Sequence, residues 1–123
     1  MSIPWQRTVG SLSLASSIFL GAYGSHGLSK LPHYTPVSTK QFETANKYQQ
    51  LHSLALIVLP SIIPIQHTLC LKLTSTFFTV GTFLFSGGVY AKVLTDDKNV
   101  GKASPAGGIC LALGWVVLAF LKR

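Results

Sequence analysis

Residues 42–56, FETANKYQQLHSLAL, decide the fold because a charged, polar half continues into an apolar half without a helix breaker. Five of its side chains recur at three- and four-residue steps and therefore share one helical face: Ala45, Tyr48, Gln49, His52 and Leu56. That face carries a phenol, an amide and an imidazole at the change from polar to apolar sequence. The pattern predicts an amphipathic helix over about residues 38–47 that leads directly into a membrane span.

The overall composition is typical of a membrane protein. Hydrophobic residues make up 48% of the 123 residues and charged residues only 11%, whereas a soluble domain carries about 25% charged residues. The length suits a single domain. Ten Lys and Arg against three acids give a net charge of +7, but the basic residues stand singly between apolar runs. We therefore expect no nucleic-acid partner, and contacts with anionic lipid headgroups instead.

Four apolar stretches are each long enough to cross a hydrocarbon layer of about 30 Å: about residues 8–29, 48–66, 73–91 and 103–121. Pro60 and Pro64 lie in the second stretch, and each removes a backbone donor, so we predict a kink or a stop near residues 59–63. Lys72 marks a predicted turn before the third stretch, and residues 92–102 form the most charged loop. The expected fold is all-α: an integral membrane protein with four transmembrane helices in an antiparallel bundle.

The ends of these stretches carry further signals. Thr35-Pro36 predicts a helix start, and Ser38 with Gln41 is a possible capping box. A cleaved signal peptide is the competing interpretation of the first stretch, and we do not expect one, because further spans follow. Basic residues number six in the two long loops and four at the opposite ends of the spans, which favours loops facing the cytoplasm or matrix.

Small residues predict close helix packing in three places. The first stretch carries a stripe at four-residue steps, and glycine pairs occur in the third and fourth. The helix-packing candidates are Ser13, Ser17, Gly21, Ser25, Gly87, Gly88, Gly107 and Gly108.

Five short motifs occur in order along the chain: GAYGSHGL (21–28), FxTAxxYQxxHxLAL (42–56), LFSGGxY (84–90), SPAGG (104–108) and GW (114–115). Together they resemble a family of small membrane proteins catalogued as a domain of unknown function. The family is typified by a bacterial inner-membrane protein and, in animals, by transmembrane protein 256. The resemblance implies a four-helix integral membrane protein of bacterial inner membranes and mitochondria, and it brings no established activity, cofactor or catalytic residue. Tyr23, Ser25 and the Asp96-Asp97-Lys98 run depart from the usual family pattern.

The candidate polar site is a junction of His26, Tyr48, Gln49 and His52. We expect the two imidazoles at the same side of the membrane, within reach of each other, with the four side chains satisfying one another across a buried interface. A proton or solute pathway is the main alternative. Metal or haem binding is a weaker one, since no third residue with ligand spacing accompanies the histidines. We predict no catalytic residue, no metal and no cofactor.

These observations predict a non-catalytic accessory subunit of a larger membrane complex. The respiratory chain is the predicted host and the mitochondrial inner membrane the predicted location, with a bacterial inner membrane as the alternative. The expected partners are membrane lipids and other membrane subunits of that complex. The alternative function is a small transporter or pore that uses the His26/His52 site.

Overall fold

The computed structural model describes residues 3–121, and every regular element in that range is helical. Four α-helices form the structure: α1 (Trp5–His26), α2 (Pro36–Ile62), α3 (Thr68–Thr95) and α4 (Ser104–Ala119). Two 3₁₀ helices, η1 (Leu28–Lys30) and η2 (Ile65–His67), lie in the connections after α1 and α2. The predicted all-α fold class is therefore confirmed.

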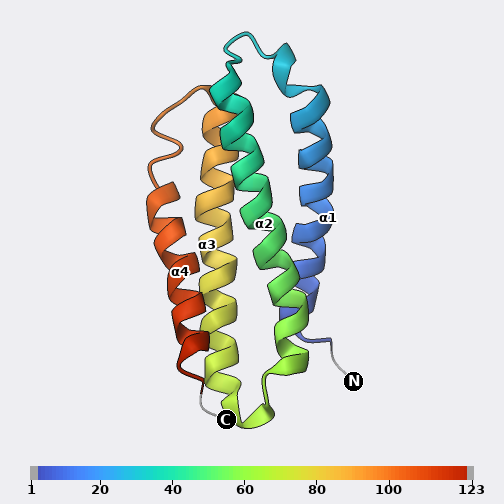
Figure 1. Ribbon diagram of the computed structural model, residues 1–123, viewed down its shortest axis with the longest axis vertical. Helices are drawn as coiled ribbons and strands as arrows, with labels where there is room; N and C mark the ends of the chain where they lie inside the picture. The colour runs from blue at the N-terminus through green and yellow to red at the C-terminus, as the bar shows by residue number, and fades with distance from the viewer. Residues whose placement is uncertain (1–2, 122–123) are drawn as a thin grey trace.

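The four helices lie side by side and antiparallel, in the order α4, α3, α2, α1 (Figure 1). Each packs mainly on its neighbour in the sequence: α1 on α2, α2 on α3, and α3 on α4. Among the described residues, no extensive contact joins the outer helices α1 and α4. The arrangement is thus an open row of helices, and both outer helices keep a face that no other helix covers.

Helix α2 is continuous from its polar start to its apolar end, as the sequence predicts. It begins at Pro36, and Thr35 is its N-cap: the Ser38 backbone N–H donates to Thr35 Oγ1 at 3.3 Å. The Thr35 N–H donates in turn to Ser38 Oγ at 3.4 Å. The predicted Ser38–Gln41 capping box is therefore wrong. Proline fits the first helical position, where no backbone donor is needed, so the helix begins at Pro36. The N-cap is therefore the residue before it, Thr35.

The turn between α2 and α3 is set by proline. Helix α2 tolerates Pro60 and ends at Ile62, and the Ile63 N–H donates to the Leu59 carbonyl at 3.0 Å. This end lies in the predicted range. Lys72, however, lies inside α3, and the turn predicted there is wrong. Pro64 has no N–H to donate and follows the helix end directly, so the chain reverses before Thr68 and not at the charged residue.

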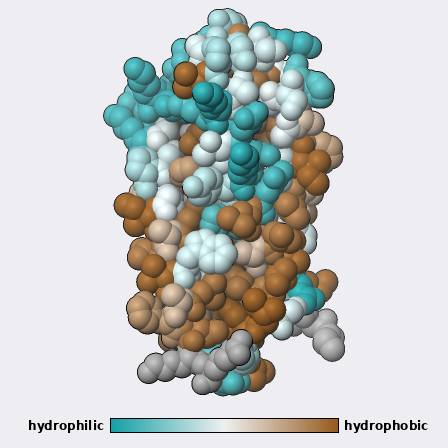
Figure 2. All heavy atoms as spheres, viewed as in Figure 1, coloured by the Kyte–Doolittle hydropathy of each residue, from teal (hydrophilic) through white to brown (hydrophobic). Residues whose placement is uncertain are grey.

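The helix row exposes many large apolar side chains and buries several polar ones beside its hydrophobic core. Large apolar side chains are mostly exposed on every helix, including Phe19 (77%), Ile62 (65%), Phe83 (78%) and Ile109 (63%). Several polar side chains are buried between the helices: Ser17, Gln49, His52, Ser53 and Ser86. Hydrophilic residues gather at the end that holds the α1–α2 and α3–α4 connections, and hydrophobic residues cover most of the remaining surface in this view (Figure 2). Such a surface is suited to lipid.

By length and composition, one helical stretch among the described residues, Ile65–Thr95, is long and apolar enough to cross a membrane. Ser104–Ala119 is a shorter apolar helix.

Candidate functional site

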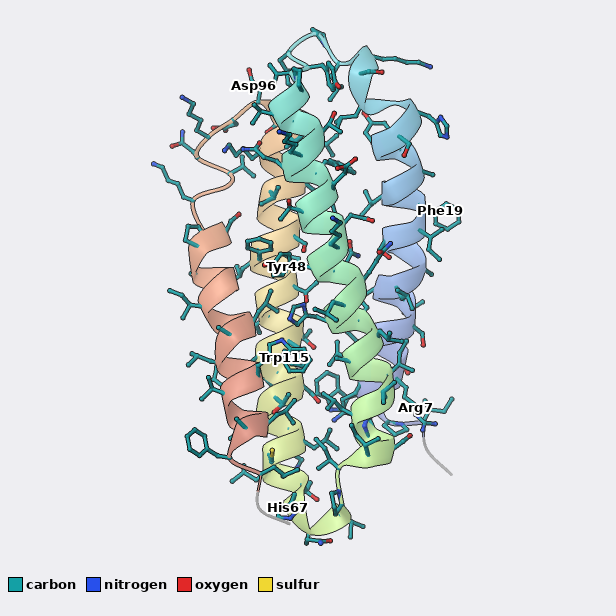
Figure 3. All side chains as sticks on the ribbon, viewed as in Figure 1. Arg7, Phe19, Tyr48, His67, Asp96 and Trp115 are labelled. Carbon is teal, nitrogen blue, oxygen red and sulfur yellow. The ribbon has the colours of Figure 1, made fainter. Side chains whose placement is uncertain are left out.

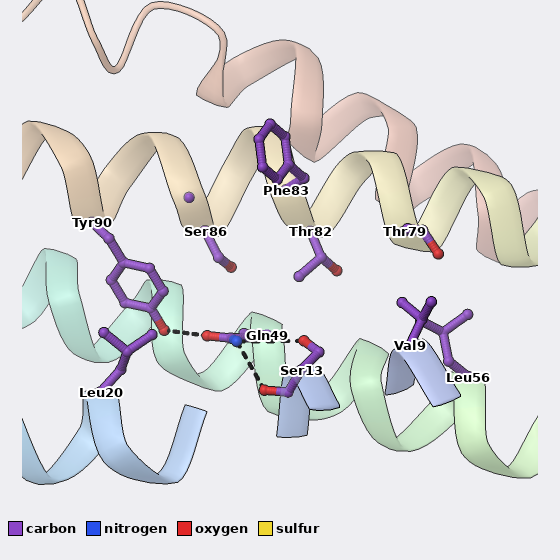
Figure 4. Close-up of a pocket in the computed structure, with 11 residues that line it drawn as sticks. Val9, Ser13, Leu20, Gln49, Leu56, Thr79, Thr82, Phe83, Ser86 and Tyr90 are labelled. Carbon is purple, nitrogen blue, oxygen red and sulfur yellow. Dashed lines mark hydrogen bonds between the residues drawn. The ribbon is translucent and has the colours of Figure 1, made fainter. Parts of the chain in front are cut away.

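Gln49, in the middle of α2, is the centre of a buried polar network that joins three helices. Its side-chain Nε2 donates to the Ser13 carbonyl of α1 at 2.9 Å and to Ser16 Oγ at 3.0 Å. Its Oε1 accepts from the Tyr90 hydroxyl of α3 at 2.7 Å (Figure 4). The side chain is 7% exposed. Both ends of the amide are therefore used in holding helices together.

Asn46, one turn before Gln49, extends the network toward the polar end. Its Nδ2 donates to the Ser17 carbonyl at 2.8 Å and to the Tyr90 hydroxyl oxygen at 3.1 Å. The Tyr90 hydroxyl thus accepts from Asn46 and donates to Gln49, which are both on α2. The Tyr90 hydroxyl of α3 therefore joins two α2 side chains that each also bond to a backbone carbonyl of α1, Asn46 to Ser17 and Gln49 to Ser13.

Two serines add further contacts between α2 and its neighbours. Ser53 Oγ donates to Ser13 Oγ of α1 at 2.6 Å. Ser86 Oγ of α3 donates to the Ala45 carbonyl of α2 at 2.8 Å. Hydroxyl groups that bond across helices in this way contribute about 0.6–2 kcal/mol each in a membrane setting. The network as a whole positions α1, α2 and α3 against one another.

A cavity of about 270 Å³ lies beside the network, between α1 and α3 (Figure 4). Its walls are mainly apolar, with Val9, Leu20, Leu56 and Phe83 among them. Thr82 also lines it, and its Oγ1 is buried without a hydrogen-bond partner within residues 3–121. The cavity therefore offers little polar surface for chemistry.

His52, three residues after Gln49, lies at the edge of the same face of α2 that is directed toward α4. Its Nδ1 lies 2.6 Å from the Tyr48 carbonyl, and its Nε2 lies 3.0 Å from Trp115 Nε1 of α4. A carbonyl only accepts and an indole N–H only donates, so Nδ1 carries the proton and Nε2 accepts. The imidazole is neutral in this arrangement, and both nitrogens are occupied. This geometry leaves no nitrogen of His52 free for a metal or a substrate.

Aromatic rings pack around His52. Tyr48 stacks on the imidazole with 6.1 Å between ring centroids, and Phe78 meets it edge-on at 5.0 Å. Trp115 in turn lies 4.8 Å from Phe78. Figure 3 shows Tyr48 and Trp115 in the space between α2 and α4. This aromatic cluster, with the Trp115–His52 hydrogen bond, ties α4 to α2 across α3.

The predicted approach of His26 to His52 is wrong. His26 is the last residue of α1 and is exposed. Ser13 pairs with Gln49, and from that level the two histidines lie in opposite directions, about 24 Å apart along the helix axes at 1.5 Å per residue. The prediction placed His52 one turn into a span, whereas α2 begins at Pro36 and His52 lies near its middle. A pore or transporter that uses the His26/His52 pair has no structural basis here.

The other predicted junction residues, Tyr48, Gln49 and His52, are neighbours on α2 but do not form one cluster. Gln49 bonds toward α1 and α3, whereas Tyr48 and His52 lie toward α4. The prediction missed Asn46 and Ser53, although their spacing from Gln49, three back and four on, places all three on one face. Trp115 was missed because nothing in its own helix indicates a partner on α2.

The predicted small packing residues divide into close and open positions. A methyl group on Gly107 would overlap the Phe85 backbone nitrogen, one on Gly88 would lie 2.5 Å from Ser104 Oγ, and one on Gly21 would lie 3.1 Å from Asn46 Oδ1. Ser13 and Ser17 face α2 in the same way. In contrast, Gly87 has open space, Gly108 has ordinary contact distances, and Ser25 is exposed and bonds to its own helix. These three residues do not mediate helix packing within residues 3–121.

Two further glycines, which the prediction did not include, allow equally close approach. A methyl group on Gly10 would lie 2.7 Å from the Ser53 carbonyl oxygen, and one on Gly81 would lie 2.9 Å from the Leu111 backbone nitrogen. Gly10 lies at the α1–α2 interface, like Ser13 and Ser17, and Gly81 lies at the α3–α4 interface, like Gly107.

Among residues 3–121, no group of three or more His, Cys, Asp or Glu side chains is arranged to hold a metal ion. Cys70 and Cys110 are free thiols. The buried polar groups of the helix row bond chiefly to one another and to backbone carbonyls, so the arrangement serves helix association.

Comparison with known proteins gives consistent matches over most of the chain. Residues 20–108 match the family described as "Protein of unknown function (DUF423)". A UPF0382 membrane protein of Staphylococcus aureus is 33% identical over 112 residues, which cover 89% of this chain and 88% of that protein. The UPF0382 inner membrane protein YgdD of Escherichia coli K12 is 31% identical over 101 residues, covering 82% of this chain and 76% of YgdD. No solved structure matches significantly.

Proposed function

We proceed from the fact that this chain belongs to the DUF423 family, and we propose that it is a non-catalytic packing subunit of a larger membrane assembly. The sequence resemblance to a membrane-protein family of unknown function is thereby confirmed. The chain's relatives are named membrane proteins, so membrane location is the common property. Their names give no reaction and no partner.

All four α-helices cross the bilayer in this proposal. Support comes from the exposed apolar side chains on each helix and from the polar groups buried between them. Helix α1, with 22 residues, is about 33 Å long and spans a hydrocarbon layer of about 30 Å, whereas α4, with 16 residues, is about 24 Å long and needs a locally thinner bilayer. Cysteine-accessibility labelling at both chain ends would test the crossings. Labelling of both ends from one side of the membrane is expected, and labelling from opposite sides would refute an even number of crossings.

The single observation that carries the packing role is that the main interhelical polar side chains are occupied in holding helices together. Gln49, Tyr90 and His52 use both their donors and their acceptors in interhelical or backbone bonds. Binding or catalysis by these three side chains would need at least one of their polar groups to be free. Each of these residues instead determines how two helices meet.

The open row explains why a partner is expected. The outer faces of α1 and α4 are apolar, and a second groove of about 490 Å³ lies between the ends of α2 and α4. A four-helix bundle closes its helices around a common core, whereas this row leaves the outer faces of α1 and α4 uncovered. Another membrane subunit that packs along an outer helix would cover this surface.

Native gel electrophoresis after extraction in mild detergent tests the proposal. The tagged chain is expected to migrate within a species much larger than 13.2 kDa, and mass spectrometry of that band would identify its partners. Harsh detergent, as a control, should release the free chain. Migration only as the free chain in every mild detergent would refute the packing role.

The proposal also concerns which membrane holds the protein and which complex it belongs to. The relatives described above are bacterial, and the Escherichia coli relative is named an inner membrane protein, which favours the bacterial alternative. These names do not support the mitochondrial inner membrane or the respiratory chain, which stay predictions. Probing the same native gel with antibodies against respiratory complexes would test that host, and co-migration with none of them would exclude it.

A further inference from the structure

Two lysines from different helices share one shallow pocket near the polar end of the molecule. Lys40 of α2 and Lys92 of α3 line a hollow of about 220 Å³, together with Gln41, Thr44 and Val89. The two helices are antiparallel here, and the neighbouring rings of Phe42 and Tyr90 lie 4.8 Å apart. The lysines are therefore held at the same level along the helix axes.

The positive charge of this pocket is not balanced by the acidic residues of the chain. Neither ammonium group has an ion-pair or hydrogen-bond partner within residues 3–121. Glu43 lines a different pocket, next to Gly21 and Gly24 of α1. Asp97 Oδ1 accepts from the Asn99 N–H at 2.9 Å, within the α3–α4 loop. The third acid, Asp96, follows Lys92 by one turn, and its backbone N–H donates to the Lys92 carbonyl at 2.9 Å, but it does not line the pocket. An anion from outside the chain would therefore meet two lysines and no carboxylate among the residues that line this pocket.

The pocket lies near the start of α2 and the end of α3, at the end of the molecule where hydrophilic residues gather (Figure 2). One turn farther along α2 is Tyr48, whose ring contacts Phe85 of α3 at 4.9 Å between centroids. Val89 and Phe85 thus continue the pocket with apolar and aromatic surface on the membrane side. Positive charge at headgroup level above an apolar track is the pattern that suits a phospholipid.

We propose that this pocket binds the phosphate of an anionic phospholipid between the ammonium groups of Lys40 and Lys92. The acyl chains would lie along Val89 and Phe85, in the direction of the aromatic cluster. The Gln41 amide is a further donor for the headgroup, whereas the Thr44 hydroxyl already donates to the Lys40 carbonyl at 2.9 Å. This site is independent of the packing role, because it does not involve the uncovered faces of α1 and α4.

Native mass spectrometry of the purified full chain tests the site, with phosphatidylglycerol and phosphatidylcholine as probes. A lysine near an anionic surface contributes about fivefold in affinity, so Lys40→Gln with Lys92→Gln should weaken phosphatidylglycerol binding by about 30-fold. Binding of phosphatidylcholine should not change. The double Lys→Arg variant at the same positions keeps both charges and should retain binding.

The matched control removes two lysines at the same end but outside the pocket, Lys30→Gln with Lys98→Gln. This variant should bind phosphatidylglycerol within about twofold of the parent chain, because its pocket charges are intact. An equal loss in both double variants would overturn the site in favour of general attraction to a basic surface. Equal binding of the two lipids by the parent chain, or displacement of the lipid by inorganic phosphate, would overturn it as well.

Discussion

Gly107 provides the sharpest test of how α3 and α4 are held together. A methyl group at this position would overlap the Phe85 backbone nitrogen and lie 2.9 Å from the Gly81 carbonyl oxygen. Both neighbours are backbone atoms of α3, which cannot rotate away as a side chain can. The Gly107→Ala variant can therefore be accommodated only if α4 moves away from α3. At Gly108, by comparison, the nearest atom to such a methyl is a Phe85 ring carbon at 3.6 Å.

The magnitude follows from comparing the two adjacent substitutions. Replacing a helical glycine by alanine gains about 0.5–1 kcal/mol from backbone entropy, and this gain is the same at both positions. Overpacking costs about 1–3 kcal/mol, and only Gly107→Ala incurs it. We therefore expect Gly107→Ala to be less stable than Gly108→Ala by about 1–3 kcal/mol. Gly108→Ala itself should be as stable as the parent chain or slightly more stable.

Reversible unfolding in mixed micelles, by titration with a denaturing detergent, would measure this difference. Helix content from circular dichroism gives the unfolding transition, and Trp115 fluorescence reports the α4 contact with Phe78. Gly87→Ala is a second control, because nothing lies within 4 Å of the position of its methyl group. Equal stability of the Gly107→Ala and Gly108→Ala variants would refute the close approach of α3 and α4.

Three further predictions concern the polar contacts. In a double-mutant cycle, Gln49→Leu and Tyr90→Phe should show a coupling of about 0.6–2 kcal/mol from their 2.7 Å hydrogen bond, and additive unfolding energies would contradict that bond. Trp115→Phe should cost about 1 kcal/mol in unfolding free energy, and His52→Ala more, because it leaves the indole N–H without its partner and opens a cavity; the reverse order would argue against the Trp115–His52 hydrogen bond. Thr35→Ala should cost about 0.5–2 kcal/mol through loss of the α2 cap, whereas Thr35→Ser should be nearly neutral in the same unfolding assay.

The helical fold could be predicted from the sequence because hydrophobic runs and prolines act locally. The start of α2 at Pro36 and its end near Pro60 and Pro64 follow from backbone chemistry that depends on a few adjacent residues. Lys72 misled the prediction, because a single charged residue at an exposed position in the first turns of a helix does not require a turn. The sequence also carries no direct signal for which helices adjoin, so the open row could not be distinguished from a compact bundle.

The site was predicted only in part, for a related reason. Helical periodicity correctly placed Gln49 and His52 on the buried side of α2, but it could not assign their partners. Those partners depend on the axial register between helices, which sets Ser13 level with Gln49 and brings Trp115 to His52. The same register moves His26 far from His52. The sequence likewise does not distinguish Gly107 from Gly108. Only the packing of α4 on α3 shows that a side chain at Gly107 would meet the α3 backbone, whereas one at Gly108 would not.

The sequential packing of the row also has a consequence for how the protein is made. A chain leaves the ribosome N-terminus first, and α1 and α2 contain both sides of the Ser13–Gln49 and Ser53–Ser13 contacts. The α1–α2 hairpin can therefore assemble before α3 is synthesised. When α3 packs on it, the Tyr90 hydroxyl forms its hydrogen bonds with Gln49 and Asn46. Helix α4 then packs on α3, and its Trp115 indole N–H donates to His52 Nε2 of α2. Each new helix can thus pack on the helix inserted just before it, and the His52–Trp115 hydrogen bond between α2 and α4 forms last.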